Sequence, residues 1–450
     1  MNRTKKYEQD FTQGPLAKQI LFFNIPLMFT NVLQILFNMA DIAVVGRFAG
    51  TLALGSVGST ATLVTLFTGL LIGISSGVNV LVAHHLGAKN EKDVRETIHT
   101  AALMSAAIGI LILFIGLFFS RPILELMNTK TELIDDAVSY MHIYFLGMPA
   151  LALFNYGNAV LSAVGDTKRP LKYLTIAGIL NVTLNLFFVI VCHLSVKGVA
   201  LASIISQYIS ATLILRVLFK SQEQYGLQLP NLRIHKDKLL ALLRISIPAG
   251  FQNAIFYVAN LFVQVGVNSF SATYVSANSA AANADGLVYD VMAAFYTACG
   301  SFIGQNYGAG KKKRILHSYL ISLAYSFCIG TAMGLTICYF GEAFLSLFTD
   351  DAAVVEAGMI RLTIMSFSYG FSAFMDSAIA ASRGLGKGLV PTIIIIMGSC
   401  VFRIIWIYTV FAYFGTITSL YLLYICSWGI TATAEIIYFV YVYKKELKHL

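Results

Sequence analysis

Long apolar segments recur along the whole chain, and each is long enough to cross a lipid bilayer as a helix. A helix rises about 1.5 Å per residue, so about 20 apolar residues span the hydrocarbon core. With 57% hydrophobic and only 12% charged residues, the 450-residue chain has too little polar surface for a water-soluble globule. The sequence therefore predicts an all-α membrane protein with twelve transmembrane helices, at residues 20–46, 53–82, 99–119, 135–161, 171–193, 198–219, 241–268, 275–305, 317–339, 357–382, 391–413 and 417–442.

The net charge of +9 is explained by how the basic residues alternate between loops. Lys and Arg concentrate in cytoplasmic loops of membrane proteins. If the N-terminus is cytoplasmic, most of the 31 basic residues lie on that side, and only a few, Arg361 among them, lie on the other. We therefore expect a multi-pass protein of the cell membrane with both termini cytoplasmic. The run from Lys311 to Arg314 then needs no nucleic-acid partner.

Neither the cysteines nor any short motif indicates catalysis. The six cysteines lie in apolar segments without the spacing of a disulfide framework or a metal site. We find no nucleotide-binding loop, no H-E-x-x-H pattern and no G-x-S-x-G elbow. We expect no enzymatic activity, no catalytic residues, no bound metal and no cofactor. The lipid bilayer and small molecules are the expected partners, and a monomer is the expected state.

The chain contains an internal repeat. A shift of 221 residues places Gly87 on Gly308 and Pro170 on Pro391, and near the start of each half a shift of 222 places Pro26 on Pro248. A constant offset over six spans indicates duplication of one six-helix unit. The prediction is an N-terminal six-helix bundle at 1–220, a cytoplasmic linker at 221–238 and a C-terminal six-helix bundle at 239–450. A pseudo-two-fold axis along the membrane normal should relate the bundles, with substrate space between them.

A polar stripe follows the first predicted helix, formed by Asn31, Gln34, Asn38 and Asp41. A carboxylate inside a membrane helix costs a few kcal/mol, so Asp41 is a candidate ion or proton site. The alternative is that Asp41 only bonds a neighbouring helix or reaches the outer interface. The seventh span has a comparable stripe without an acid, which includes Tyr257 and Asn260.

Other polar residues also fall inside predicted spans. Two helically spaced pairs could complete a cavity with Asp41 or could simply hold helices together: Asn155 with Asn158, and Asn181 with Asn185. Three acids of the C-terminal half could bind cationic substrate, or one of them could neutralise the deep Arg403: Asp285, Asp290 and Asp376. Glu435 is expected to reach the interface. Pro26 and Pro248 should kink their helices, either as hinges or as fixed architecture.

The repeat and several loops together resemble the multidrug and toxic compound extrusion (MATE) transporters. The residues that carry the resemblance are Asn38-Met39-Ala40-Asp41, Val45-Gly46-Arg47, His85-Leu86-Gly87-Ala88-Lys89, Gln305-Asn306-Tyr307-Gly308-Ala309-Gly310 and Gly165-Asp166-Thr167-Lys168-Arg169-Pro170. The resemblance implies a V-shaped pair of bundles, with Asp41 as the coupling acid and Asn181 as a polar site residue. Asn185 stands where many members have a second acid, and Phe256 stands near a position where some have a Glu.

These observations favour a secondary active antiporter that exports organic cations or other drugs in exchange for H⁺ or Na⁺ by alternating access. H⁺ is favoured, because Na⁺ prefers several oxygen ligands and the positions matched to Asp41 offer only Asn158, Asn181 and Asn185. The substrate-binding candidates are Gln34, Asn38, Asn155, Tyr257, Asn260, Asp285, Asp290 and Asp376. The alternative is a flippase for a lipid-linked or polysaccharide precursor. A flippase for an anionic headgroup would favour several arginines facing the cavity, whereas only Arg403 lies deep in a span.

Overall fold

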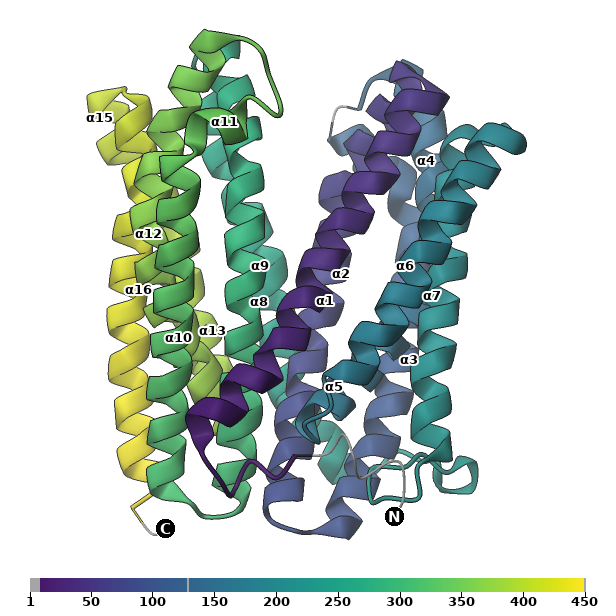
Figure 1. The fold of residues 1–450 in the computed structure, drawn as a ribbon, viewed down its shortest axis with the longest axis vertical. Coiled ribbons are helices and arrows are strands. Elements are labelled where there is room, and N and C mark those ends of the chain that lie inside the picture. Colours follow the sequence, from purple (N-terminus) through teal and green to yellow (C-terminus); the bar gives the residue numbers. More distant parts are fainter. Residues whose placement is uncertain (1–8, 128, 449–450) are drawn as a thin grey trace. The chain divides into compact units, whose positions relative to one another are not determined.

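The helices of the computed structural model follow the predicted apolar segments (Figure 1). The structure describes residues 9–127 and 129–448, and every regular element within them is a helix. The first part contains α1 (Leu16–Val44), η1 (Val45–Ala49), α2 (Thr51–Gly87), α3 (Glu91–Leu126), α4 (Thr131–Leu146), α5 (Met148–Ala163), α6 (Lys168–Leu186), η2 (Phe187–Val191), α7 (Ser195–Lys220) and η3 (Leu229–Asn231). The second contains α8 (Lys236–Asn268), α9 (Ala272–Gly308), α10 (Lys312–Tyr339), α11 (Gly341–Leu345), α12 (Ala352–Gly384), α13 (Leu389–Ile395), η4 (Ile396–Val401), α14 (Phe402–Trp406), η5 (Ile407–Phe411), α15 (Ala412–Phe414) and α16 (Ile417–Glu446). Four of the η segments are π-helical turns, and η3 is a 3₁₀ turn.

The spans agree in number with the prediction, although two of them differ in character. Among the described residues, ten helices are long and apolar enough to cross a membrane. α4 and α5, expected as one span, are bent by 45° relative to each other at Gly147 and together form an eleventh span. α12 is 33 residues long and is less apolar because it buries Arg361, Asp376 and several serines. With α12 the spans number twelve, and the predicted all-α membrane fold is confirmed.

The chain divides into two compact units, and the division falls inside two helices. Unit 1 consists of Gln9, Asp10 and Ile25–Gly250, and unit 2 consists of Phe11–Asn24 and the chain from Phe251 onward. One division lies just before Ile25 and Pro26 in α1, and the other lies two residues after Pro248 in α8. These units differ from the predicted bundles, because the predicted linker and the start of α8 belong to unit 1 and the start of α1 belongs to unit 2.

The segment before Asn24 is fixed to unit 2 at the end of α9 and the start of α10. The Phe11 amide donates to Gln305 Oε1 at 3.0 Å, and Asn306 Nδ2 donates to the Phe11 carbonyl at 3.1 Å. The Phe11 ring also stacks on Phe302 with 3.8 Å between ring centroids. Arg314 then donates to the carbonyl groups of Phe11 and Gly14. These bonds explain why a short stretch of the first helix packs with the second half of the chain.

The predicted linker is similarly fixed to unit 1. The amide of Gln228 donates to His99 Nε2 at 3.0 Å, and the amide of His235 donates to Thr100 Oγ1 at 3.1 Å. Lys238 at the start of α8 donates to Asp93 at 2.7 Å. Tyr225 and Leu227 lie in the apolar core of the unit. The linker is therefore a packed element of unit 1.

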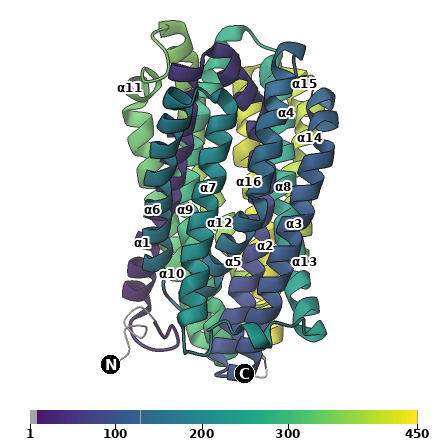
Figure 2. The same ribbon diagram turned by 90° about the vertical axis from the view of Figure 1, so that its right-hand side faces the viewer.

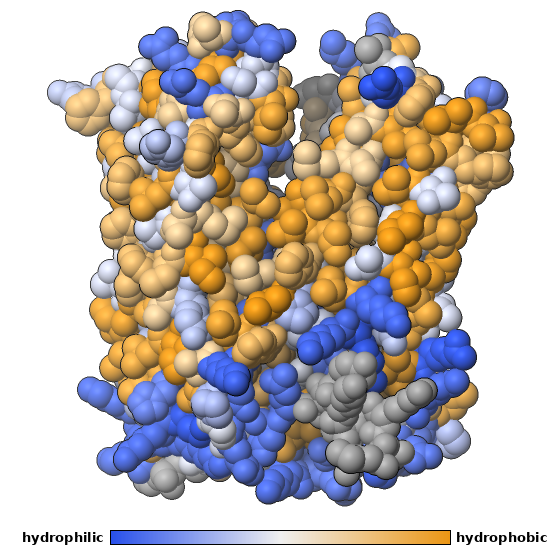
Figure 3. Space-filling model, viewed as in Figure 1, coloured by the Kyte–Doolittle hydropathy of each residue, from blue (hydrophilic) through white to orange (hydrophobic). Residues whose placement is uncertain are grey.

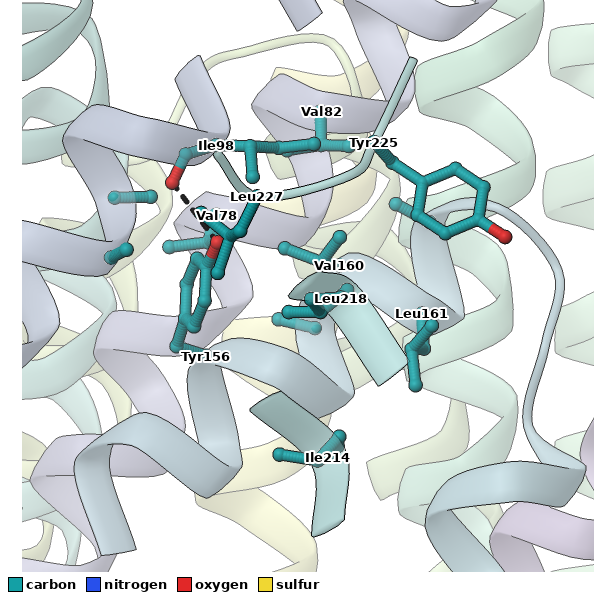
Figure 4. Packing of buried hydrophobic residues seen from close by; sticks show 14 of the residues in the cluster. Val78, Val82, Ile98, Tyr156, Val160, Leu161, Ile214, Leu218, Tyr225 and Leu227 are labelled. Carbon is teal, nitrogen blue, oxygen red and sulfur yellow. Dashed lines mark hydrogen bonds between the residues drawn. The ribbon is translucent and has the colours of Figure 1, made fainter. Parts of the chain in front are cut away.

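The core of unit 1 forms where α5 packs against α2, α3 and α7. Figure 4 shows Val78, Val160 and Leu218 in this core, with Tyr156 pointing toward α3. The Tyr156 hydroxyl donates to the Ile98 carbonyl at 3.0 Å, which satisfies the one polar atom of that buried side chain.

The core of unit 2 forms around α12, which packs along α9, α10 and α16. The long helices of each unit run lengthwise beside one another in both views (Figures 1 and 2). Apolar side chains cover the flanks of these helices and hydrophilic side chains gather at their ends (Figure 3). Exposed apolar residues on the flanks include Phe29, Leu111, Phe118 and Phe367. Water would disfavour such a surface, whereas lipid tails cover it without penalty.

Candidate functional site

The carboxylate of Asp41 accepts hydrogen bonds from two neighbouring helices of unit 1. Asn185 Nδ2 of α6 donates to one carboxylate oxygen, and Ser203 Oγ of α7 donates to the other at 3.3 Å. Asn181 Nδ2 donates to Ser203 Oγ at 3.4 Å, and Asn185 Nδ2 also lies 3.3 Å from Asn181 Oδ1. We call these four residues the Asp41 network. It joins three helices through one half-buried carboxylate and three buried polar side chains.

A close helix contact brings Asp41 to its partners. The ring of Phe37, one turn before Asp41, lies against Gly178 of α6, where a Cβ atom would overlap the ring. Gly178 lies one turn before Asn181, so the same contact aligns both partners on α6 with the carboxylate. After Asp41 the chain leaves α1 through η1 and turns at Gly50, whose φ of 91° is readily adopted only by glycine.

Irregular helix geometry surrounds the polar residues. η1 begins at Val45, four residues after Asp41, and η2 begins at Phe187, two residues after Asn185. π-helical turns are rare and are frequent at functional sites. The charge of Asp41 also acts on the phenol groups of Tyr140 and Tyr144 in α4. A carboxylate with donors on both oxygens, held in such a helix, can bind and release a small cation or a proton.

The structure brings together some of the predicted residues of unit 1 and not others. Asn181 and Asn185 contact each other and Asp41 or Ser203, as above. Asn158 lies outside the Asp41 network, and its buried Oδ1 has no hydrogen-bond partner among the described residues. Asn155 donates to the Leu151 carbonyl of its own helix at 3.0 Å. Gln34 and Asn38 precede Asp41 on α1 and form none of the bonds of the network.

In unit 2, Asp285 is engaged by a buried arginine. Arg361 of α12, which is 5% exposed, forms an ion pair with Asp285 and also donates to Asn278. Tyr369 donates to the second Asp285 oxygen at 2.7 Å. The sequence placed Arg361 among the few basic residues on the outer side of the membrane, and the structure buries its side chain within the unit. α9 and α12 pack closely along their length, so Arg361 faces Asp285 inside the unit.

Arg403 of α14 has no carboxylate partner among the described residues. Its side chain is fully buried, and Nη1 donates to Asn260 Oδ1 of α8 at 2.7 Å. The expectation that one of the three acids neutralises Arg403 is therefore not met in this structure. Asp285 pairs with Arg361 instead.

The two other acids of unit 2, Asp376 and Asp290, interact with tyrosine side chains. Asp376 of α12 is buried and accepts a hydrogen bond from the Tyr289 hydroxyl at 3.2 Å. Asp290 of α9 interacts electrostatically with Tyr257 of α8. Glu435 of α16, expected at the interface, is fully buried, and neither of its carboxyl oxygens has a hydrogen-bond partner among the described residues. That expectation is wrong because α16 packs along α12.

The loop between α5 and α6 has a structural role. Asp166 accepts hydrogen bonds from the amides of Lys168 at 3.2 Å and Arg169 at 3.1 Å, and it pairs with the Arg169 side chain. These bonds satisfy amides at the start of α6. Burial raises the pKa of the Asp166 carboxyl group, and the Arg169 charge acts in the opposite direction.

Comparison with protein families settles the relationship of the chain. A family model described as MatE matches residues 26–187 and again residues 248–409. The chain belongs to the MatE family of MATE transporters. The two matches are equal in length and begin at Pro26 and Pro248, so the predicted repeat is a repeat of the MatE unit.

Curated relatives and solved structures agree with this membership. The chain is 28% identical to the probable multidrug resistance protein YpnP of Bacillus subtilis, over 80% of this chain and 81% of that protein. It is 24% identical to the FAD transporter of Shewanella oneidensis, over 79% and 80% of the two chains. Its fold matches an outward-facing structure of a multidrug resistance MATE family transporter of the MOP superfamily, with a TM-score of 0.90, 21% identity and 98% of each chain covered. This MatE protein is therefore a multi-pass membrane transporter with the family's fold.

Sequence reasoning missed three residues of this MatE protein that the structure places in polar networks. Ser203 gave no signal, because a serine in a membrane helix most often bonds its own backbone. The pairing of Arg361 with Asp285 required knowledge of which helix faces meet. Asn278 accepts hydrogen bonds from Arg361 and from Tyr421. Its only signal in the sequence was that it lies in an apolar span, and many other polar residues do so too.

Proposed function

We propose that this chain is a secondary active antiporter that exports organic cations or other drugs in exchange for H⁺, with Asp41 as the coupling carboxylate. The observation that supports this best is the Asp41 network, in which one intramembrane carboxylate links α1 to α6 and α7. A change in the charge of Asp41 alters its bonds to both helices. Coupling requires such a differential interaction with two states.

The groups around Asp41 favour H⁺ over Na⁺. Asn185 presents an amide N–H and Ser203 presents a hydroxyl O–H to the carboxylate. As oriented here, these groups turn hydrogen atoms rather than oxygen lone pairs toward the carboxylate, whereas a metal cation needs several oxygen ligands. A proton needs only the carboxylate itself. Asn158, a candidate ligand from the sequence, stands outside the network. We therefore propose H⁺ as the coupling ion and no resident cofactor.

The two units change access by bending α1 and α8 at Pro26 and Pro248. Both divisions between the units fall within three residues of these prolines, and proline removes a backbone hydrogen bond from its helix. In this proposal the protein works as a monomer in the cell membrane, with both termini cytoplasmic.

Cationic cargo would interact with unit 2. Asp376 and Asp290 are the candidates, whereas Asp285 is neutralised by Arg361. Gln34, Asn38, Asn155, Tyr257 and Asn260 remain candidate contacts for the neutral parts of a drug. One relative is named an FAD transporter, and FAD is an anion, so similarity alone does not choose the cargo.

The experiment is dye efflux in everted membrane vesicles, with a pH gradient and a Na⁺ gradient imposed separately. We expect ethidium transport with the pH gradient only. Asp41→Asn should abolish transport, whereas the matched control Asp136→Asn, at an exposed position of α4, should not. Transport driven by Na⁺ at constant pH would refute the assignment of H⁺. The absence of transport under both gradients would refute the antiporter.

A further inference from the structure

Two aromatic rings and one amide lie close to the guanidinium group of Arg403. The guanidinium carbon lies 5.0 Å from the centroid of Phe256 and 4.7 Å from that of Tyr424. Nη1 donates to Asn260 Oδ1 at 2.7 Å. We call these four residues the Arg403 site. It combines side chains of α8, α14 and α16 within unit 2.

The remaining edge of the guanidinium has no hydrogen-bond partner in the described part of the chain. Nε and Nη2 are buried, and neither has a hydrogen-bond partner among the described residues. These two nitrogens share one edge of the guanidinium plane, and their N–H groups point the same way. This edge matches the two oxygens of a carboxylate in a bidentate pair. The site therefore lacks one planar, singly charged acceptor.

The charges around Tyr424 support the same conclusion. The guanidinium of Arg361 lies 5.6 Å from the same ring, so two arginines flank Tyr424. Asp285 neutralises Arg361, while no carboxylate among the described residues lies within ion-pair distance of Arg403. A buried charge without a partner is costly, and such charges inside membrane proteins mark functional sites. One negative charge from a ligand would balance the pair.

The backbone around Arg403 has irregular helix geometry. α14 has only five residues and is flanked by two π-helical turns, η4 and η5. The same kind of turn adjoins Asp41 and Asn185 in unit 1. π-helical turns are frequent at functional sites. Because the free edge is covered in this structure, the groups that cover it must shift for a ligand to bind.

We propose that the Arg403 site binds the carboxylate of an aromatic substrate. The inference rests on the proposed export of drugs and narrows the cargo to compounds that carry a carboxylate in addition to a cationic group. A carboxylate is favoured over a phosphate monoester because the site offers one uncompensated positive charge. Asp376 of the same unit, which accepts a hydrogen bond from the Tyr289 hydroxyl, is the candidate for the cationic group.

The test compares rhodamine B, which has a free carboxylate and a cationic xanthene, with its ethyl ester, which lacks the carboxylate. Binding to the purified protein is measured by fluorescence anisotropy. Wild type should bind rhodamine B more tightly than the ester. Arg403→Gln should weaken rhodamine B binding about tenfold or more, since hydrogen bonds to charged groups are lost, and should leave ester binding within about twofold.

Two controls separate recognition from folding. Arg403→Lys keeps the charge but loses the bidentate edge, so it should also weaken rhodamine B selectively. Arg361→Gln, at an arginine that already has a carboxylate partner, should affect both dyes equally. A competition experiment on the wild-type protein does not depend on whether a variant folds. There, benzoate should displace rhodamine B and the uncharged benzamide should not.

The proposal would be overturned if Arg403→Gln weakened the binding of both dyes equally. It would also be overturned if benzamide displaced rhodamine B as effectively as benzoate. Efflux of the ester by wild type under a pH gradient reports on the antiporter alone. The proposed function can therefore hold while the Arg403 site fails, and the two failures are distinguishable.

Discussion

The ring of Phe37 in α1 lies directly against Gly178 in α6, where any Cβ atom would overlap it. The contact is one turn from Asp41 on α1 and one turn from Asn181 on α6. The spacing of these two helices therefore sets the geometry of the hydrogen bond from Asn185 to Asp41.

We predict that Gly178→Ala separates α1 from α6 and impairs dye efflux. Overpacking of a close contact costs about 1–3 kcal/mol. Gly58→Ala is the matched control, because a Cβ there meets nothing within 4 Å. The efflux rate and the thermal unfolding temperature should both fall for Gly178→Ala, and neither should fall for Gly58→Ala. Phe37→Leu in the Gly178→Ala background should restore part of the loss, and no restoration would argue against this contact as the cause.

The donors of the Asp41 network should matter more than other intramembrane amides. Asn185→Ala and Ser203→Ala each remove a hydrogen bond to a carboxylate, worth about 1.5–3 kcal/mol. We expect each to slow pH-driven efflux about tenfold or more. Asn158→Ala, which removes a side chain outside the network, should slow efflux less. Initial rates in vesicles with matched protein amounts would test this order, and a larger effect at Asn158 would contradict it.

The Asp285–Arg361 ion pair should be structural. Breaking a buried pair costs about 3–5 kcal/mol because one charge stays unpaired. Asp285→Asn and Arg361→Gln should each lower the thermal stability of the purified protein. The double variant should be more stable than either single variant, because neither charge remains. If the single variants unfold like wild type but lose transport of cationic dyes, Asp285 instead contacts substrate.

The predicted linker should resist proteolysis even though it joins two repeats. Trypsin can cut after Arg233 and Lys236, but Lys238 is held by Asp93 at 2.7 Å and the nearby amides bond His99 and Thr100. Asp93→Asn should therefore speed cleavage in this segment. Asp237→Asn is the control, since Asp237 is exposed, lies 3.4 Å from Lys238, and such surface pairs contribute little. Equal cleavage rates in both variants would contradict the docking role of Asp93.

The sequence predicted the membrane fold because apolar length and repetition do not depend on tertiary contacts. It also grouped Asn158, Asn181 and Asn185 with Asp41, since intramembrane amides and acids are few and costly, and the structure brings Asn181 and Asn185 but not Asn158 into the network. It did not predict Ser203 or the Asp285–Arg361 pair, because these depend on which faces of α7, α9 and α12 meet. Pro26 and Pro248 indicated kinks in these helices, but the divisions inside α1 and α8 were missed, because the unit against which each part of a helix packs depends on tertiary contacts.

Those divisions have a consequence for whether the protein can be split into two halves. The first half of the chain contains Phe11–Asn24, which packs in unit 2. The second half contains the start of α8, which packs in unit 1. A half-protein ending in the 221–238 segment would lack part of the unit it mainly forms. Neither half should fold alone, whereas both expressed together should complement each other. By the same reasoning, an ancestor with a single repeat would have needed two copies that exchanged the beginnings of their first helices, as in a domain-swapped dimer.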